Sequence, residues 1–355
     1  MWIYYANLLS IFLYGIIYTW IKDKRLRKGL IFVFAAQLVC LTGFRKYTVG
    51  IDTKQYYYWF RYLTANNIDK FWRQSSDKGA YIYKLLNYVV WKLGGSFQVV
   101  LFIAAIIAIA PVIYYICKNS KNIFLSFFIY LSFNYYLYTL ITIRQSAAYG
   151  IILLSVDSIK KRKPFQFLIL VLLAAGFHTS ALFFLPAYLL YNMKINQKNI
   201  IAYILILAIV WVSRIYIARF IINNIFSDYT VEISNSYTYL FIHVLILVFG
   251  LLVYKGYVNK RYSDCEKRNI DYIYVYMMIG ILLMIGCSVA SNALRIAYFY
   301  TIQIVVFIPN VIAYVSNTKI RFILQIGTFV LCFLIFGIFI KGFMHQNMDY
   351  VPFWN

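Results

Sequence analysis

Long apolar runs alternate with short polar stretches along almost the whole chain. Many runs approach the roughly 20 residues that a helix needs to cross a bilayer, and several are apolar on every face. Since only helices and closed barrels satisfy their backbone groups within lipid, the pattern predicts an all-α, polytopic membrane protein. We predict about 12 transmembrane helices, at about 2–20, 29–44, 97–117, 122–139, 144–159, 165–178, 180–192, 199–217, 239–255, 271–289, 293–315 and 321–342.

The stretch 80–93 departs from this pattern, because it is short and carries Lys84, Asn87 and Lys92. These features predict a helix that lies in the membrane interface or re-enters the membrane without crossing it. If 80–93 does not cross, the basic loops all fall on one side, as the positive charge of cytoplasmic loops requires; they are 22–28, 118–121, 160–163, 194–198, 255–268 and 319–321. We therefore expect 45–95, with its interfacial helix, to form a loop on the outer face, and both chain ends to lie outside.

Composition agrees with this architecture, because 63% of the residues are hydrophobic and only 13% are charged. The predicted spans and their short loops account for the length of the chain, so we expect a single transmembrane domain over 1–355. Lys and Arg outnumber Asp and Glu by 34 to 11, which in a soluble protein would suggest nucleic acid. Here basic cytoplasmic loops and a surface that faces anionic lipid or substrate explain the excess better, so the lipid bilayer is an expected partner and nucleic acid is not.

The cysteines are scattered along the chain, and no CxxC or Cys/His spacing typical of a metal site is present. We therefore expect no disulfide framework, no metal and no other cofactor. The first apolar run, 2–20, lacks a basic n-region and a small-residue cleavage site, so it is expected to be a retained span.

Isolated polar residues gather at the ends of spans on the predicted outer face. They are Arg45, Asp52, Asp77, Arg144, Gln145, His178 and Arg295. Charges at the edge of a membrane span are costly and are by default functional candidates. Three arginines at one level would build an electropositive pocket, and the planar guanidinium suits a diphosphate because it donates two parallel hydrogen bonds.

An aromatic patch follows Asp52 and contains Tyr56 and Trp59, with Arg61 beside it. Aromatic faces and guanidinium groups suit a site for sugar and phosphate, although the same patch would also serve as a membrane-interface belt. The other candidates have ordinary alternatives too. Arg45 could be an interface anchor, Asp52 a turn residue and His178 a satisfied core histidine. Their joint placement on one side favours a functional site.

Several blocks of the chain resemble the EpsG family of Wzy-type polysaccharide polymerases. The blocks run in the family's order over almost the whole chain: Phe44-Arg45, Val49-Gly50-Ile51-Asp52-Thr53, Asp77-Lys78-Gly79, Arg144-Gln145, Phe177-His178-Thr179-Ser180, Arg295 before Tyr298-Phe299, and Tyr350-Val351-Pro352-Phe353. The block around Asp52 is fairly specific, and the others are weak alone. Asp77 departs from the pattern, in which Glu is expected.

The resemblance implies a glycosyltransferase in the bacterial cytoplasmic (inner) membrane, with its active site on the outer face and a GT-C-like fold. It would polymerise undecaprenyl-diphosphate-linked oligosaccharide units, which serve as both donor and acceptor, and release undecaprenyl diphosphate. The products would be exopolysaccharide, capsule or O-antigen, and a chain-length regulator protein would be a further partner. Without a metal motif, we expect metal-independent transfer.

In that reaction Arg144 and Arg295, with Arg45 as a third cation, would stabilise the charge that develops on the leaving diphosphate. We expect His178 to be the base, and Asp52, held ionised by the arginines, to orient the attacking hydroxyl. Further candidates for substrate binding are Tyr56, Trp59, Arg61, Asp77 and Gln145.

Two other classes of protein stay open at this point. A membrane O-acyltransferase of surface glycans also uses a histidine and arginines at a membrane face. A flippase or transporter of lipid-linked oligosaccharides would show a two-sided cavity and internal repeats. A ligase of the same superfamily would differ only in its acceptor.

Overall fold

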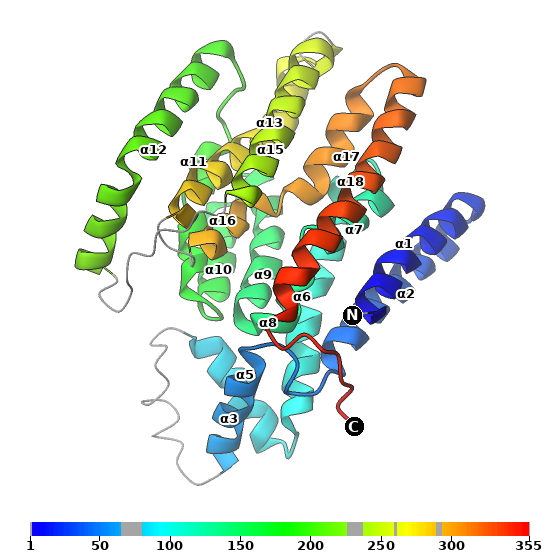
Figure 1. Ribbon diagram of the computed structural model, residues 1–355, viewed down its shortest axis with the longest axis vertical. Helices are drawn as coiled ribbons and strands as arrows, with labels where there is room; N and C mark the ends of the chain where they lie inside the picture. The colour runs from blue at the N-terminus through cyan, green and yellow to red at the C-terminus, as the bar shows by residue number, and fades with distance from the viewer. Residues whose placement is uncertain (1, 65–79, 226–236, 259–260, 289–292, 355) are drawn as a thin grey trace.

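The computed structural model describes the chain except for residues 1, 65–79, 226–236, 259–260, 289–292 and 355. The described residues form helices and connecting loops without a β-strand, which confirms the all-α class. The long helices stand side by side in a bundle (Figure 1). Two shorter helices, α3 (Thr53–Thr64) and α5 (Tyr81–Lys92), lie at one end of it.

Seven helical segments in the described part of the chain are long and apolar enough to cross a membrane. They are α1 (Trp2–Trp20), α2 (Lys24–Gly43), α6 (Phe97–Asn119), most of α12 (Gln197–Ile225), α13 (Thr238–Val253) with the π-helix η2 (Tyr254–Val258), α16 (Ala293–Thr301) with α17 (Ile304–Tyr314), and α18 (Thr318–Met344). They match seven predicted spans, so a polytopic membrane protein is confirmed. The count of 12 stays a prediction.

The other predicted spans differ in length and regularity. They are α7 (Ile123–Ser132) with α8 (Tyr138–Ile141), α9 (Ile143–Lys160), α10 (Pro164–Ala175), the 3-10 helix η1 (Thr179–Phe184) with α11 (Ala187–Leu190), and α15 (Asp264–Met284) with the 3-10 helix η3 (Ile285–Ser288). The stretches 122–139 and 180–192 are therefore not single helices. A 3-10 helix rises about 2.0 Å per residue instead of about 1.5 Å, so η1 covers more distance per residue than an α-helix.

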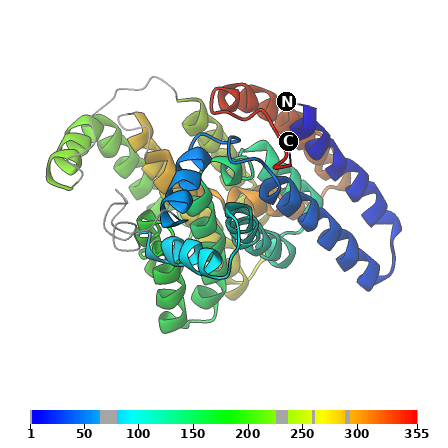
Figure 2. The same ribbon diagram turned by 90° about the horizontal axis from the view of Figure 1, so that it is seen from below.

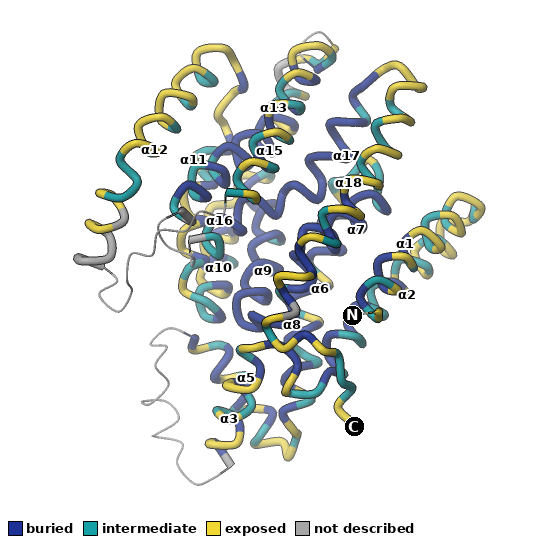
Figure 3. Tube along the Cα trace, viewed as in Figure 1, coloured by how far each residue is buried: buried dark blue, intermediate teal, exposed yellow. Residues whose placement is uncertain are grey.

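Helix α9 is largely buried and is also among the more polar of the long helices. Fifteen of its 18 residues are buried, and it packs against α6, α10 and α16. By contrast, none of the apolar window of α12 is buried, and only 22% of that of α1 (Figure 3). Lipid can cover apolar side chains but cannot satisfy polar ones, so protein neighbours allow α9 to carry polar residues that a lipid-facing helix would not.

Helices α6 and α9 approach closely one turn before Pro111, which lies inside α6. Proline has no N–H, so the Ile107 carbonyl lacks its helical donor. Gly150 of α9 faces this carbonyl, and a Cβ at that position would lie 2.5 Å from the Ile107 oxygen. Glycine at position 150 therefore permits the contact between the two helices.

Polar side chains cap several helices where they begin. Asp23 accepts hydrogen bonds from the backbone N–H groups of the first turn of α2, and Asn122 and Asn317 do the same for α7 and α18. Ser263 and Glu266 form a capping box before α15. Such caps typically contribute about 1 kcal/mol each, because they satisfy donors that the helix leaves without partners.

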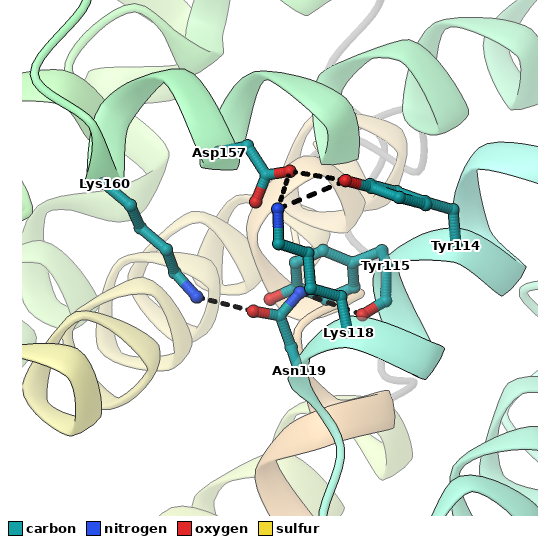
Figure 4. Close-up of polar contacts among 6 residues, drawn as sticks. All are labelled: Tyr114, Tyr115, Lys118, Asn119, Asp157 and Lys160. Carbon is teal, nitrogen blue, oxygen red and sulfur yellow. Dashed lines mark hydrogen bonds and ion pairs between the residues drawn. The ribbon is translucent and has the colours of Figure 1, made fainter.

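Helix α6 begins beside α5 and ends, at Asn119, among the predicted cytoplasmic loops; we call this the basic end. There Lys118 Nζ lies 2.5 Å from Asp157 Oδ2, and Lys160 Nζ donates to Asn119 Oδ1 at 2.5 Å (Figure 4). Asn310 Nδ2 of α17 donates to the Asn119 carbonyl at 2.9 Å. Basic loops from separate parts of the sequence thus meet at one end. Which side of the membrane it faces stays a prediction from loop charge.

Candidate functional site

Asp52, Arg144 and Arg295 lie together at the end of the bundle that carries α3. Asp52 directly precedes α3, Arg144 is the second residue of α9, and Arg295 is in the first turn of α16. The Asp52 carboxyl interacts electrostatically with both guanidinium groups. Among the described residues, no ion pair within 4 Å joins Asp52 to either arginine. A carboxyl therefore faces two cations without direct contact, and we call these three residues the charged cluster.

Aromatic side chains of α3 hold Arg144 in place. The guanidinium carbon lies 5.1 Å from the centroid of the Tyr56 ring and 5.3 Å from that of Trp59. Arg144 Nε also donates to Tyr56 Oη at 3.3 Å, and the two rings contact edge to face at 5.4 Å. Since Tyr56 and Trp59 are three residues apart on one helix, they share a face and fix the plane of the guanidinium.

Two hydrogen bonds between α9 and α16, which we call the α9–α16 joint, set the position of Arg295. Gln145 Nε2 and Tyr149 Oη both donate to the Arg295 carbonyl, at 2.9 Å and 2.7 Å. Gln145 and Tyr149 are four residues apart and so lie on the same face of α9. Because Gln145 directly follows Arg144, the joint ties the two arginines to one rigid helix. Gln145 thus contacts the backbone of Arg295 through its amide nitrogen, a contact that the sequence did not predict.

The C-terminal tail fastens the loop that ends in Asp52. Three backbone hydrogen bonds of 2.8 Å join them: Lys46 N to Val351 O, Gly50 N to Asn347 O, and Phe353 N to Phe44 O. Tyr4 Oη of α1 donates to the Met348 carbonyl at 2.8 Å and holds the tail from its other side. The tail block of the sequence therefore has a structural role at the site.

Gly50 sits at the tightest point of the same loop. Its φ is +89°, and a Cβ would lie 2.0 Å from the Leu140 carbonyl oxygen of α8. Thr53 Oγ1 donates to that same oxygen at 3.2 Å. The left-handed backbone and the close Leu140 carbonyl both require glycine at position 50. The turn at Gly50 leads directly into Asp52, which is the residue before α3.

Arg45 is buried beside this loop and interacts electrostatically with Tyr83 of α5, which also interacts with Arg144. Its side chain is 1% exposed; NH1 donates to the Thr42 carbonyl, and NH2 is 3.5 Å from both Thr53 Oγ1 and the Thr139 carbonyl. Burial lowers the pKa of Arg45 to about 10, so it stays charged at neutral pH. The side chain of Arg45 thus points into the protein and not toward water, and its role in binding a diphosphate stays a prediction. Arg45 links the end of α2 to α3 and α8.

Burial outweighs the arginines in setting the pKa of Asp52. Burial raises the pKa of this half-buried carboxyl, while Arg295 and then Arg144 lower it, and the net direction is upward. The arginines therefore do not set the direction of this shift, and the role of Asp52 in the reaction stays a prediction. A carboxyl with a raised pKa is a better proton acceptor than an ordinary aspartate.

The other candidate residues from the sequence, His178, Arg61 and Asp77, do not belong to the charged cluster as described. His178 is half-buried and begins η1, which packs against α9 and α16; its Nδ1 lies 2.6 Å from Ser180 Oγ and 3.4 Å from Ser180 N. Arg61 is exposed in the last turn of α3. Asp77 lies outside the described residues. The structure thus brings Asp52, Arg144 and Arg295 within electrostatic reach of one another, and places His178 at the start of an element that packs against α9 and α16.

Sequence reasoning missed helix α3, where we predicted only a loop. Its buried residues are Thr53, Tyr56, Phe60 and Leu63. Their spacing of three, four and three is the helical pattern, so the signal was present beneath the many aromatic residues.

Helix α5 confirms the predicted helix at 80–93, and its 12 residues are too few to cross a bilayer. In the view from below, α3 and α5 lie across the middle of the bundle (Figure 2).

An apolar groove of about 590 Å³ runs along the outside of α6, α9 and α10. Ile82 of α5 and Phe177 line one part of it, and Tyr114, which contacts Lys118 and Asp157 at the basic end, lines another. The Ile82 N–H donates to the Gly176 carbonyl at 2.8 Å, so α5 is attached to the chain just before His178. The groove therefore connects the membrane-facing surface with the end of the bundle that holds the cluster.

The charged cluster can bind an anion between two guanidinium groups and can offer a carboxylate to a hydroxyl. In the described part of the chain, no group of three His, Cys, Asp or Glu side chains could hold a metal ion. Metal independence itself stays a prediction.

Comparison with known proteins gave one match. A model of the EpsG family matches residues 28–354, which is nearly the whole chain and includes every residue of the site described above. No curated protein and no solved structure matches it, so the expected likeness to the GT-C fold stays a prediction.

Proposed function

Since the chain belongs to the EpsG family, which indicates a membrane polysaccharide polymerase, we propose that it polymerises undecaprenyl-diphosphate-linked oligosaccharide units. One lipid-linked unit would be the donor and another the acceptor. The observation that carries this proposal is the charged cluster, in which Arg144 and Arg295 from two different helices both act on the Asp52 carboxyl.

In the proposed reaction, a hydroxyl at the non-reducing end of the acceptor attacks the anomeric carbon of the donor glycan. A new glycosidic C–O bond forms, and the bond between that carbon and the diphosphate oxygen breaks. The electron pair leaves with undecaprenyl diphosphate, and the hydroxyl proton passes to a base. The growing glycan is thereby transferred onto the incoming unit.

Arg144 and Arg295 suit the leaving diphosphate. A guanidinium stays charged and donates in a fork that matches phosphate oxygens. Stacking on Tyr56 and Trp59 orients one guanidinium in advance, and the backbone joint to α9 positions the residue that carries the other. Donors held in place before the reaction stabilise developing charge without reorganising.

Asp52 is the base that the geometry favours. It lies beside both arginines, so a hydroxyl placed next to a bound diphosphate would be within its reach. His178 remains the alternative, but its Nδ1 is engaged by Ser180. This preference reverses the order that the sequence suggested.

The apolar groove suits the polyprenyl chain of such a substrate. It is lined almost entirely by hydrocarbon and starts near the cluster at Phe177, directly before His178. A lipid tail in the groove would leave its diphosphate at the arginine end. This arrangement would let the substrate arrive sideways from the bilayer.

The proposal is tested on the glycans of a strain that lacks the gene. We expect loss of polymer and accumulation of single repeat units on lipid or at the surface, with recovery on complementation by the wild type. Polymer of normal length with reduced acetyl content would instead support an acyltransferase, and lipid-linked units trapped in the inner leaflet would support a flippase. Either result would overturn the proposal.

The Asp52→Asn variant separates the two candidate bases. Wild-type activity should rise with pH as Asp52 ionises, and burial places this rise above the ordinary range of an aspartate. The variant should lose most of its activity, about 100-fold or more, together with that rise. The measurement is the pH profile of undecaprenyl diphosphate release by the purified protein. A variant that keeps the wild-type profile would point to His178.

Stability gives a second readout of the same group. The folded-state pKa of Asp52 exceeds the unfolded value, so the folded protein binds more protons between the two values. The contribution of Asp52 to stability should therefore fall as pH rises through this window, and Asp52→Asn should remove that fall.

A further inference from the structure

Helix α5 presents a buried polar face to the site. Tyr83 and Asn87 are four residues apart on this helix, and each is 2% exposed. Residues with this spacing lie one above the other on the same face. Sequence analysis did not identify either residue as a candidate for the site; Asn87 only helped to predict that 80–93 does not cross the membrane.

Both side chains hold a polar atom without a partner. The Tyr83 hydroxyl and the Asn87 Oδ1 are buried, and neither makes a hydrogen bond of good geometry with a described residue, although the Asn87 amide lies close to the Tyr83 hydroxyl. The Asn87 Nδ2 is used, because it donates to the Tyr83 carbonyl at 2.7 Å. Folded proteins rarely leave buried polar atoms unpaired, because each then loses its hydrogen bonds to water without replacement. Two such atoms, on residues one helical turn apart, indicate that a bound molecule supplies their hydrogen-bond partners.

Their position connects them to the charged cluster. The Tyr83 ring contacts Tyr56 edge to face at 5.5 Å, and Tyr56 is the ring that holds Arg144. The Tyr83 hydroxyl also interacts electrostatically with Arg144. The unpaired atoms thus lie next to the arginine to which we assign the diphosphate.

We propose that Tyr83 and Asn87 form a subsite for the sugar directly attached to the diphosphate. The inference rests on the proposed function. The phenol offers a donor and the amide oxygen an acceptor, and a sugar hydroxyl can accept from the first and donate to the second. A phosphate oxygen only accepts, so it would leave Asn87 Oδ1 unpaired. Both atoms are shut off from solvent here, so α3 and α5 must separate when the sugar enters.

The test uses Tyr83→Phe, which removes only the hydroxyl. In the free protein Tyr83→Phe loses only the close approach of the Asn87 amide, so its Tm should change little. The KM for lipid-linked units should rise about tenfold or more, because a hydrogen bond to substrate is lost. Asn87→Leu should act in the same direction. The measurement is undecaprenyl diphosphate release by purified protein at varied substrate concentration.

Tyr276→Phe is the matched control. Tyr276 is equally buried, but its hydroxyl donates to the Ala187 carbonyl at 2.9 Å, away from the site. This variant should lower Tm and leave KM unchanged. A wild-type KM in Tyr83→Phe would overturn the subsite and indicate that ordered water satisfies the pair. Absence of undecaprenyl diphosphate release by the wild type would instead overturn the proposed function itself.

Discussion

Arg144→Ala should reduce the rate of polymer formation about 100- to 1,000-fold or more. Arg144 is 8% exposed and packs over the rings of Tyr56 and Trp59, so its guanidinium is held in one orientation. Alanine removes a fixed cation from the place where the leaving diphosphate develops charge. Arg144→Lys should recover only part of the rate, because an ammonium lacks the planar fork. The rate of polymer formation in membranes with equal protein levels measures both.

Arg162→Ala is the control for a general effect of losing an arginine. Arg162 lies at the basic end and stacks on Tyr191 at 5.0 Å, so it shares a cation–π contact with Arg144 but not its position. Its removal should leave polymer formation within about twofold of wild type, since an exposed cation–π contact contributes only about 0.5–1 kcal/mol. Normal polymer from Arg144→Ala at wild-type protein level would contradict the assignment.

Gly50→Ala should destabilise the protein by about 2–5 kcal/mol and abolish most activity. The left-handed backbone alone costs an alanine about 1–2 kcal/mol, and overpacking typically adds about 1–3 kcal/mol. At φ +89° the new Cβ would lie 2.0 Å from the Leu140 carbonyl oxygen, so the loop must shift, and Asp52 with it. Thermal unfolding in detergent and polymer formation measure the two effects.

Gly94→Ala separates backbone strain from crowding. Gly94 also has a positive φ, +77°, but a Cβ there meets nothing within 4 Å. Gly94→Ala should therefore lower the free energy of unfolding only by the cost of the left-handed backbone, about 1–2 kcal/mol, and should leave activity largely intact. If Gly50→Ala proved no worse than Gly94→Ala, the loop would not need its close contact with α8.

Sequence alone predicted the membrane class and most helices, because long apolar runs and basic loops are strong signals. Those two signals also placed Asp52, Arg144 and Arg295 on one face. They could not show that Gln145 bonds to the backbone of Arg295, since backbone carbonyls leave no mark in a sequence. The inward turn of Arg45 was hidden for the same reason, because its partners include the carbonyls of Thr42 and Thr139.

Other features depend on packing that no local pattern encodes. The upward direction of the Asp52 pKa results from burial outweighing Arg144 and Arg295, which are far from Asp52 in the sequence, and only the fold fixes the extent of burial. Tyr83 belongs to a helix that sequence identified correctly, but its proximity to Tyr56 arises from the meeting of α3 and α5. The break at 180–192 reflects a 3-10 helix, whose apolar residues resemble those of an ordinary span.

The most direct test of the central claim is the affinity of the purified protein for the lipid product. If the charged cluster binds the diphosphate, the wild type should bind undecaprenyl diphosphate at least about tenfold more tightly than undecaprenyl monophosphate, a difference of about 1.4 kcal/mol. Arg144→Ala and Arg295→Ala should each remove most of this preference. Equal affinity of the wild type for both lipids, or a preference that survives in both variants, would contradict the account.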